Sequence, residues 1–81
     1  MPALTLIGKP GCHLCDDART VITEVLGDFD DVELTELSIF DDAALAAEYS
    51  EDIPVVLIDG RVHSNWRVDP ARLRAKLLEA S

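Results

Sequence analysis

The stretch GKPGCHLC occupies residues 8–15 and contains both cysteines of the 81-residue chain. The apolar run ALTLI precedes it at residues 3–7, and a segment with helical periodicity follows it. A strand that ends in a Gly/Pro turn, followed by a Cys-x-x-Cys pair that opens a helix, is the setting of a thiol–disulfide switch. We therefore predict redox chemistry at Cys12 and Cys15, with the rest of the chain holding the two sulfurs and presenting a partner to them.

The composition indicates a single acidic domain over residues 1–81. Hydrophobic residues make up 48% of the chain, enough for one core, and the formal net charge is −9. This charge argues against nucleic acid and against anionic membrane surfaces as partners, because phosphate binding needs clustered Lys and Arg. No apolar stretch approaches the roughly 18 residues of a membrane span, and the first residues lack the basic start of a signal peptide. We expect a cytoplasmic monomer. In the reducing cytoplasm, a cysteine pair is more often catalytic or metal-binding than structural.

The periodicity of the first half predicts a β-α-β unit. Residues 3–7 read as a short strand buried on both faces, and residues 8–11 as a turn. Over residues 13–26 the apolar side chains recur on one side of a helix, and Gly27 is placed to stop it. Residues 32–37 alternate apolar and acidic side chains, which indicates a strand with one solvated face. The two strands should be parallel and joined by a right-handed connection.

The second half predicts a short helix and then a hairpin. Residues 43–49 are rich in alanine and read as helical, with residues 41–42 as candidate N-caps. The most strand-like run of the chain follows at residues 55–58. Residues 59–60 read Asp-Gly, the signal of a type I′ hairpin turn. Residues 61–63 would be the returning strand.

The closing helix begins with Asp69 as N-cap and Pro70 at the first helical position. Its apolar stripe consists of Leu73, Leu77 and Leu78. The complete order is β-α-β-α-β-β-α. It predicts an α/β fold in which a central four-stranded mixed sheet has three helices, with helices on both faces.

Cys12 is predicted to attack a disulfide and Cys15 to resolve the mixed disulfide. Cys12 lies at the start of the helix, where unpaired N–H groups point outward, and Lys9 is three residues upstream. Both features stabilise a thiolate. Cys15, one turn further into the helix, should be more buried and less ionised. Asp16 and Asp17 oppose thiolate formation, but the two adjacent side chains cannot both face the sulfurs.

Other interpretations of these residues stay open. The cysteines could pack as small hydrophobes, or could bind zinc with His13 and His63 as further ligands. Small metal-carrier domains also place Cys-x-x-Cys before a helix, but their order is β-α-β-β-α-β, which the helix at residues 43–49 breaks. His13 could hydrogen-bond a sulfur, or simply lie exposed. Trp66 could cap the core, or could anchor a partner beside the thiols.

With this order of elements, the chain resembles the thioredoxin superfamily and, within it, a small glutaredoxin-like protein. Three pieces carry the resemblance: KPGCHLC at residues 9–15, DIPV at residues 52–55, and the hairpin over residues 55–63. The resemblance implies a thiol–disulfide oxidoreductase with a cis peptide between Ile53 and Pro54. The Ile53 backbone would then face the thiols, pair with an extended substrate and keep metal off the cysteines.

The substrate is expected to be a disulfide in a protein or in a small molecule. We expect the substrate to bind beside the Cys pair and to contact five residues: Lys9, His13, Ile53, Pro54 and Trp66. We expect no metal and no bound cofactor at this site.

The electron donor is left open by a departure from the glutathione-dependent glutaredoxins. After the hairpin, those proteins carry a Gly-Gly step and an Asp that hold glutathione. Here residues 64–69 read SNWRVD, so Asp69 matches the acidic residue while the Gly-Gly step is absent. Glutathione as a co-substrate and a reductase are therefore both candidates for the donor. The alternative function is a redox-sensitive adaptor or metal carrier that uses the same cysteines without efficient turnover.

Overall fold

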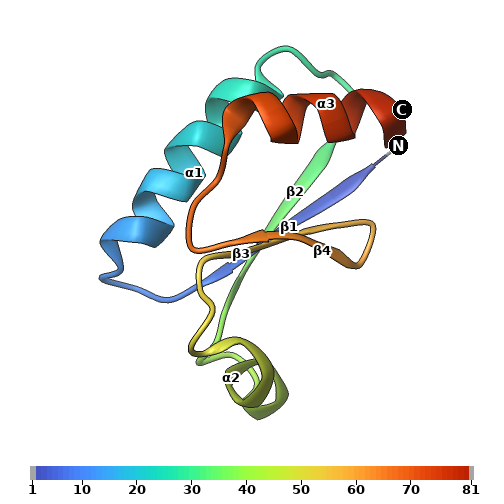
Figure 1. Cartoon of the computed structure of the whole chain (residues 1–81). Coiled ribbons are helices and arrows are strands. Elements are labelled where there is room, and N and C mark those ends of the chain that lie inside the picture. The colour runs from blue at the N-terminus through green and yellow to red at the C-terminus, as the bar shows by residue number, and fades with distance from the viewer. Residues whose placement is uncertain (1, 81) are drawn as a thin grey trace.

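The computed structural model describes residues 2–80, and its elements follow the predicted order (Figure 1). The elements are β1 (Ala3–Gly8), α1 (His13–Leu26), β2 (Glu33–Ser38), α2 (Ala43–Tyr49), β3 (Val55–Ile58), β4 (Arg61–Asn65) and α3 (Pro70–Ala80). The strands form one sheet in the order β2-β1-β3-β4. Within these residues, the predicted α/β fold with a four-stranded mixed sheet and three helices is confirmed.

β1 lies inside the sheet and leads directly to the cysteines. It pairs in parallel with β2 and antiparallel with β3, and β4 runs antiparallel to β3. Figure 1 shows α1 and α3 over one face of the sheet and α2 on the other. Because helices cover both faces, β1 is apolar on both sides. The turn to α1 therefore starts from a strand that is held firmly in place.

The larger apolar layer lies between the sheet and the pair α1 and α3. Leu4 and Leu6 of β1 are buried there against Ile22 of α1 and against Leu73 and Leu77 of α3. Side chains four residues apart lie on the same face of a helix, which is why Leu73 and Leu77 both reach this layer. The packing orients α1, whose first turn carries the cysteines.

The smaller apolar layer lies under α2. Ile7 of β1 and Val55 of β3 are buried there with Ile39, and the half-buried Leu45 and Tyr49 of α2 pack over them. Leu4 and Leu6 belong to one layer and Ile7 to the other, as alternation along a strand requires. The prediction that the first strand is buried on both faces is confirmed.

The hairpin turn has the backbone conformation that its sequence predicts. Asp59 and Gly60 have φ values of 50° and 83°, and a type I′ turn needs positive φ at both central residues. β4 extends to Asn65, two residues beyond the predicted end, because its pairing with β3 continues past a register shift. This extension carries the chain toward the cysteine end of the sheet.

Two local predictions differ from the structure. α1 ends before Gly27 as expected, but Gly27 has φ −58° and continues in a right-handed turn instead of adopting a left-handed cap. Leu78 is 62% exposed, so it is not part of the buried stripe of α3. It follows Leu77 by one residue, and one residue turns the side chain about 100° around the helix. Within residues 2–80, no helix has the length and the hydropathy needed to cross a bilayer.

The adjacent leucines of α3 allow a matched test of this packing. We expect Leu77→Ala to lower the free energy of unfolding by about 2–5 kcal/mol, because it leaves a cavity in the larger layer. Leu78→Ala should change it by less than about 1 kcal/mol, because most of that side chain is exposed. Urea unfolding of the two variants measures the difference, and equal losses would contradict the orientation of α3.

Candidate active site

Cys12 is the N-cap of α1, and its sulfur takes the part that a side-chain oxygen has in most caps. Its backbone is extended, with φ −99° and ψ 115°. The backbone N–H of Cys15 donates to Cys12 Sγ at 3.3 Å, and the N–H of Asp16 donates to the Cys12 carbonyl oxygen at 3.1 Å. The half-buried sulfur therefore faces unpaired N–H groups and the positive end of the helix dipole. Helix N-termini of this kind are common binding sites for negatively charged groups.

Cys15 lies one turn further along and is 1% exposed. Burial, and secondly its hydrogen bond with the Cys12 side chain, raise the pKa of the Cys15 thiol to about 11, while a backbone hydrogen bond with Lys9 acts in the opposite direction. Both cysteines are free. The structure thus separates a more accessible sulfur at the cap from a buried, protonated one, in the arrangement that the sequence predicts.

Gly8 is a site residue that the sequence interpretation missed. It ends β1, and a Cβ atom at this position would lie 2.8 Å from Cys15 Sγ and 3.2 Å from Cys15 Cβ. Real Cβ atoms do not approach sulfur so closely, so only glycine fits here without movement. A glycine at the end of a strand was the available signal, but the sequence alone assigns it to the turn.

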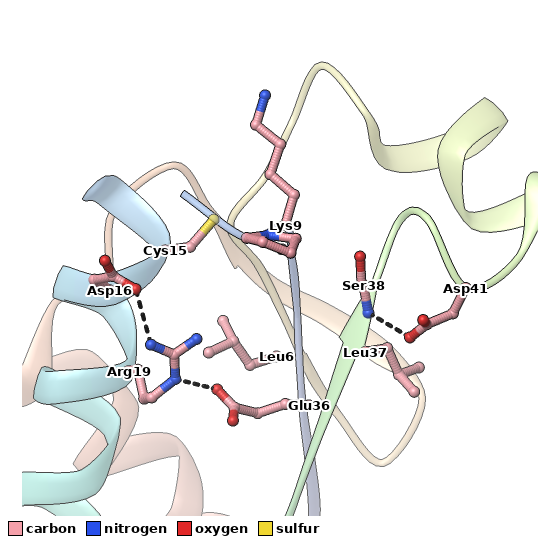
Figure 2. Close-up of a pocket in the computed structure, with 11 residues that line it drawn as sticks. Leu6, Lys9, Cys15, Asp16, Arg19, Glu36, Leu37, Ser38 and Asp41 are labelled. Carbon is pink, nitrogen blue, oxygen red and sulfur yellow. Dashed lines mark hydrogen bonds and ion pairs between the residues drawn. The ribbon is translucent and has the colours of Figure 1, made fainter. Parts of the chain in front are cut away.

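Lys9 and His13 are both exposed. Figure 2 shows the Lys9 side chain pointing away from Cys15 and from the other labelled residues. Lys9 influences the buried thiol through its backbone and not through its ammonium group. His13 is the first residue of α1. Their predicted contacts with a substrate stay predictions.

The peptide between Ile53 and Pro54 is cis, as the resemblance implies. Pro54 is buried and Ile53 half-buried. The carbonyl oxygen of Pro54 accepts a hydrogen bond from the N–H of Trp66 at 2.8 Å. The loop before β3 and the segment after β4 are therefore joined next to each other.

Trp66 is held as a partly exposed wall and does not cap the core. It is 56% exposed, its φ is 67°, and its Nε1 donates to the Glu51 carbonyl oxygen at 3.1 Å. A left-handed backbone is strained for a bulky residue and persists only where its surroundings hold it, here through two hydrogen bonds to the loop before β3. Trp66 lines a pocket of about 210 Å³ with Leu14, which lies between the cysteines, and with Asp17.

His63 lines neither the Trp66 pocket nor the cleft that reaches Cys15. It shares a groove between β4 and α3 with Arg72 and Lys76, and burial first, then these two cations, lower its pKa. Across residues 2–80, no three His, Cys, Asp or Glu side chains gather closely enough to hold a metal ion. His63 therefore does not join the cysteines in a ligand set in this structure.

A second cleft reaches Cys15 from the side of β2. It has a volume of about 260 Å³, and its lining includes Cys15, Asp16, Arg19 and Glu36 (Figure 2). Arg19 forms an ion pair with Asp16 at 2.9 Å and a second one with Glu36 of β2. The sequence interpretation missed Arg19 and Glu36. The acidic alternation of β2 shows that Glu36 is solvated but not that it faces Cys15.

A sequence profile decides the family. The profile described as "Glutaredoxin-like domain (DUF836)" matches residues 3–78. The chain belongs to this glutaredoxin-like family. Uncharacterized proteins of Mycobacterium tuberculosis and Mycobacterium bovis are 33% identical to it over 84 residues, which span 99% of this chain and 87% of each relative.

Solved structures share the fold of this glutaredoxin-like protein. An X-ray structure of a structural-genomics target protein from X. campestris is 35% identical, with a TM-score of 0.75 over 96% of this chain and 97% of that one. The oxidized form of mitochondrial thioredoxin 3 from Saccharomyces cerevisiae is 14% identical, with a TM-score of 0.70 over 96% of this chain and 77% of that one. The fold is thioredoxin-like, and family, fold and the pair Cys12 and Cys15 together support a redox-type function.

The contact at Gly8 predicts a loss of folding stability whose size depends on the Cys15 sulfur. We expect Gly8→Ala to cost about 1–3 kcal/mol of folding free energy, because the new methyl group displaces Cys15. In a Cys15→Ala background the sulfur is gone, so the same substitution should cost less. Urea unfolding of the four proteins gives the coupling between the two sites. Equal costs in both backgrounds would show that the sulfur is not what the methyl group meets.

The raised pKa of Cys15 predicts alkaline destabilisation of the reduced protein. Above pH 9.0 the unfolded chain releases this proton, whereas the folded protein keeps it up to about pH 11. Stability from this group is therefore complete below pH 9.0 and falls toward pH 11 by about 1.4 kcal/mol per pH unit. Urea unfolding under reducing conditions should show this slope in wild type and a shallower one in Cys15→Ala. Identical slopes would contradict it.

Proposed function

We propose that this protein is a thiol–disulfide oxidoreductase of glutaredoxin-like type that reduces disulfides in proteins or small molecules. The observation that carries the proposal is the Cys12 sulfur at the N-cap of α1, accepting the N–H of Cys15 at 3.3 Å. Reactive cysteines are commonly found at helix N-termini, and the thiolate is the form that attacks a disulfide. The family and the thioredoxin-like fold support the same chemistry.

The reaction needs both sulfurs in turn. Cys12 thiolate bonds to one sulfur of the substrate disulfide, and the other substrate sulfur leaves as a thiolate. Cys15 then loses its proton and bonds to Cys12 Sγ, which breaks the mixed disulfide and releases the second substrate thiolate. Two electrons pass from the dithiol to the substrate, and the protein is left with a disulfide between Cys12 and Cys15.

The substrate is proposed to bind beside Trp66 and the loop that contains the buried Pro54. The hydrogen bond between these residues holds the wall of the Trp66 pocket against the loop before β3. An extended substrate segment could pair with the Ile53 backbone by strand addition, while Lys9 and His13 border the thiols from the turn and the helix start.

The electron donor is proposed to be glutathione or a reductase. Asp69 is used in the fold, because its carboxylate accepts the N–H of Ala71 at 2.9 Å as the cap of α3. Trp66 has a positive φ, the backbone conformation that favours glycine. Its side chain, however, is a bulky indole. Coupled assays with glutathione plus glutathione reductase, and with thioredoxin reductase, would identify the donor. We propose that the protein works as a cytoplasmic monomer, since a reducing compartment regenerates the dithiol.

A redox-sensitive adaptor is the second candidate, and the high pKa of Cys15 favours it. A resolving thiol with a pKa of about 11 is almost fully protonated near neutral pH, which slows turnover. Metal carriage by the same cysteines is tested together with it. Mass and metal analysis of the protein under reducing conditions distinguishes these functions. A stoichiometric bound metal ion would contradict the oxidoreductase function, and a disulfide that cycles readily would contradict metal carriage.

Single cysteine variants test the order of attack. We expect Cys12→Ser to lose disulfide reductase activity to background, because the attacking thiolate is gone. Cys15→Ser should still attack and should accumulate a mixed disulfide with the substrate, visible as an added mass that a reductant removes. The proposal fails if Cys12→Ser keeps full activity, and the assigned roles are reversed if only Cys12→Ser traps the substrate.

A further inference from the structure

We propose that Asp16 accepts the proton of Cys15 through water in the cleft beside β2, with Arg19 and Glu36 holding its carboxylate in place. This inference rests on the proposed oxidoreductase function and assigns a residue to its second step. It also separates the tasks of two neighbouring aspartates in the first turns of α1.

The second step creates the need for a proton acceptor. Cys15 can attack only as a thiolate, and the residue is 1% exposed. While the substrate is bonded to Cys12, that sulfur carries neither charge nor proton, so its opposition to ionisation of Cys15 is removed. Burial still opposes it, and the side of the sulfur toward Cys12 is blocked by the substrate. The proton therefore has to leave by another route.

The cleft beside β2 supplies that route. Cys15 and Asp16 both line it, and its volume of about 260 Å³ exceeds several times the roughly 30 Å³ that one water occupies. Figure 2 shows the Cys15 sulfur directed away from the axis of α1, with Asp16 and Arg19 on the same helix and Glu36 on β2 across the gap. Because Cys15 and Asp16 line the same cleft, water held there is the proposed carrier of the proton between them.

Arg19 positions the Asp16 carboxylate. Its Nη1 donates to Asp16 Oδ1 at 2.9 Å and its Nε donates to Glu36, so one guanidinium joins α1 to β2 across the cleft. Within residues 2–80, Asp16 Oδ2 has no hydrogen-bond partner and is available to water. Arg19 also places its positive charge beside this carboxylate.

The other charged groups at the cleft do not serve equally well. Lys9 points away from the sulfur, and Asp41 Oδ2 accepts the N–H of Ser38 at 2.9 Å. Asp17 adjoins Asp16 in the chain but lines the Trp66 pocket on the other side of α1. The titratable and charged residues that line the cleft with Cys15 are Lys9, Asp16, Arg19, Glu36 and Asp41, and Cys12 is hydrogen-bonded to Cys15.

The step balances without an added oxidant or reductant. The Cys15 proton passes to a water, and that water gives a proton to Asp16 Oδ2. The electron pair left on Cys15 Sγ forms the bond to Cys12 Sγ, and the bond from Cys12 Sγ to the substrate breaks. The substrate sulfur leaves with that pair as a thiolate and takes up a proton, and Asp16 returns its own to solvent.

The test compares Asp16→Asn with Glu24→Gln, which removes an exposed carboxylate of α1 that lines none of the pockets described above. Each protein, fully reduced, is mixed with a chromogenic small-molecule disulfide in a single turnover, so that formation and release of the mixed disulfide are timed separately. We expect Asp16→Asn to slow the release by roughly 10-fold to 100-fold near neutral pH, the lower part of the range for proton-transfer catalysis. Glu24→Gln should release at the wild-type rate, and neither variant should change the first step.

The pH profile separates a proton acceptor from a mere charge. With a proton acceptor built into the cleft, wild-type release should change little between about pH 6 and about pH 9. Release by Asp16→Asn should instead rise roughly tenfold per pH unit, and should approach wild type where hydroxide ionises Cys15 directly. Added formate should rescue Asp16→Asn in proportion to its concentration, because a small carboxylate can enter the open cleft.

Opposite outcomes overturn the inference and leave the proposed function distinguishable. If Asp16 acts only as a negative charge, its removal eases ionisation of Cys15, and Asp16→Asn would release as fast as wild type or faster. A loss of rate that formate does not rescue, with an unchanged pH profile, would show a structural role. Absence of any mixed disulfide on Cys12 in wild type would overturn the oxidoreductase function itself.

Discussion

The contact between the Cys15 sulfur and the bare backbone of Gly8 is the constraint on which the site depends. It joins the end of the central strand to the first turn of α1 at a distance that no other residue than glycine allows. Because Cys15 is drawn inward, Cys12 is left at the cap position, where its sulfur receives a backbone N–H. The difference between an accessible cysteine and a buried one is therefore a consequence of packing and not of the two residues themselves.

The packed sheet supplies the rigidity that this contact needs. β1 is covered on one face by α1 and α3 and on the other by α2, so the end of the strand cannot yield to relieve the contact. The same arrangement places the loop before β3 beside the segment after β4, where Pro54 and Trp66 are hydrogen-bonded. Two pockets result, one on each side of the first turns of α1.

The charged side chains are also divided between the two sides of α1. The chain has a net charge of −9, yet Arg19 is placed between Asp16 and Glu36 at the cleft that leads to the buried thiol. Exposed ion pairs contribute little to stability, so the value of this pair of contacts lies in orientation. On the other side of α1, Asp17 lies beside the indole of Trp66. Adjacent residues of one helix therefore face different chemistry.

Local patterns in the sequence determined the order of the elements, the type I′ turn at Asp59 and Gly60, and the position of the Cys-x-x-Cys pair at the start of a helix, because each depends on neighbours within a few residues. The cis peptide followed only from the family resemblance. Tertiary structure alone decided that Gly8 touches Cys15, that Glu36 reaches the cleft and that Leu78 is exposed. These facts depend on how strands and helices pack across long stretches of chain, and a residue's type does not reveal which element will lie against it.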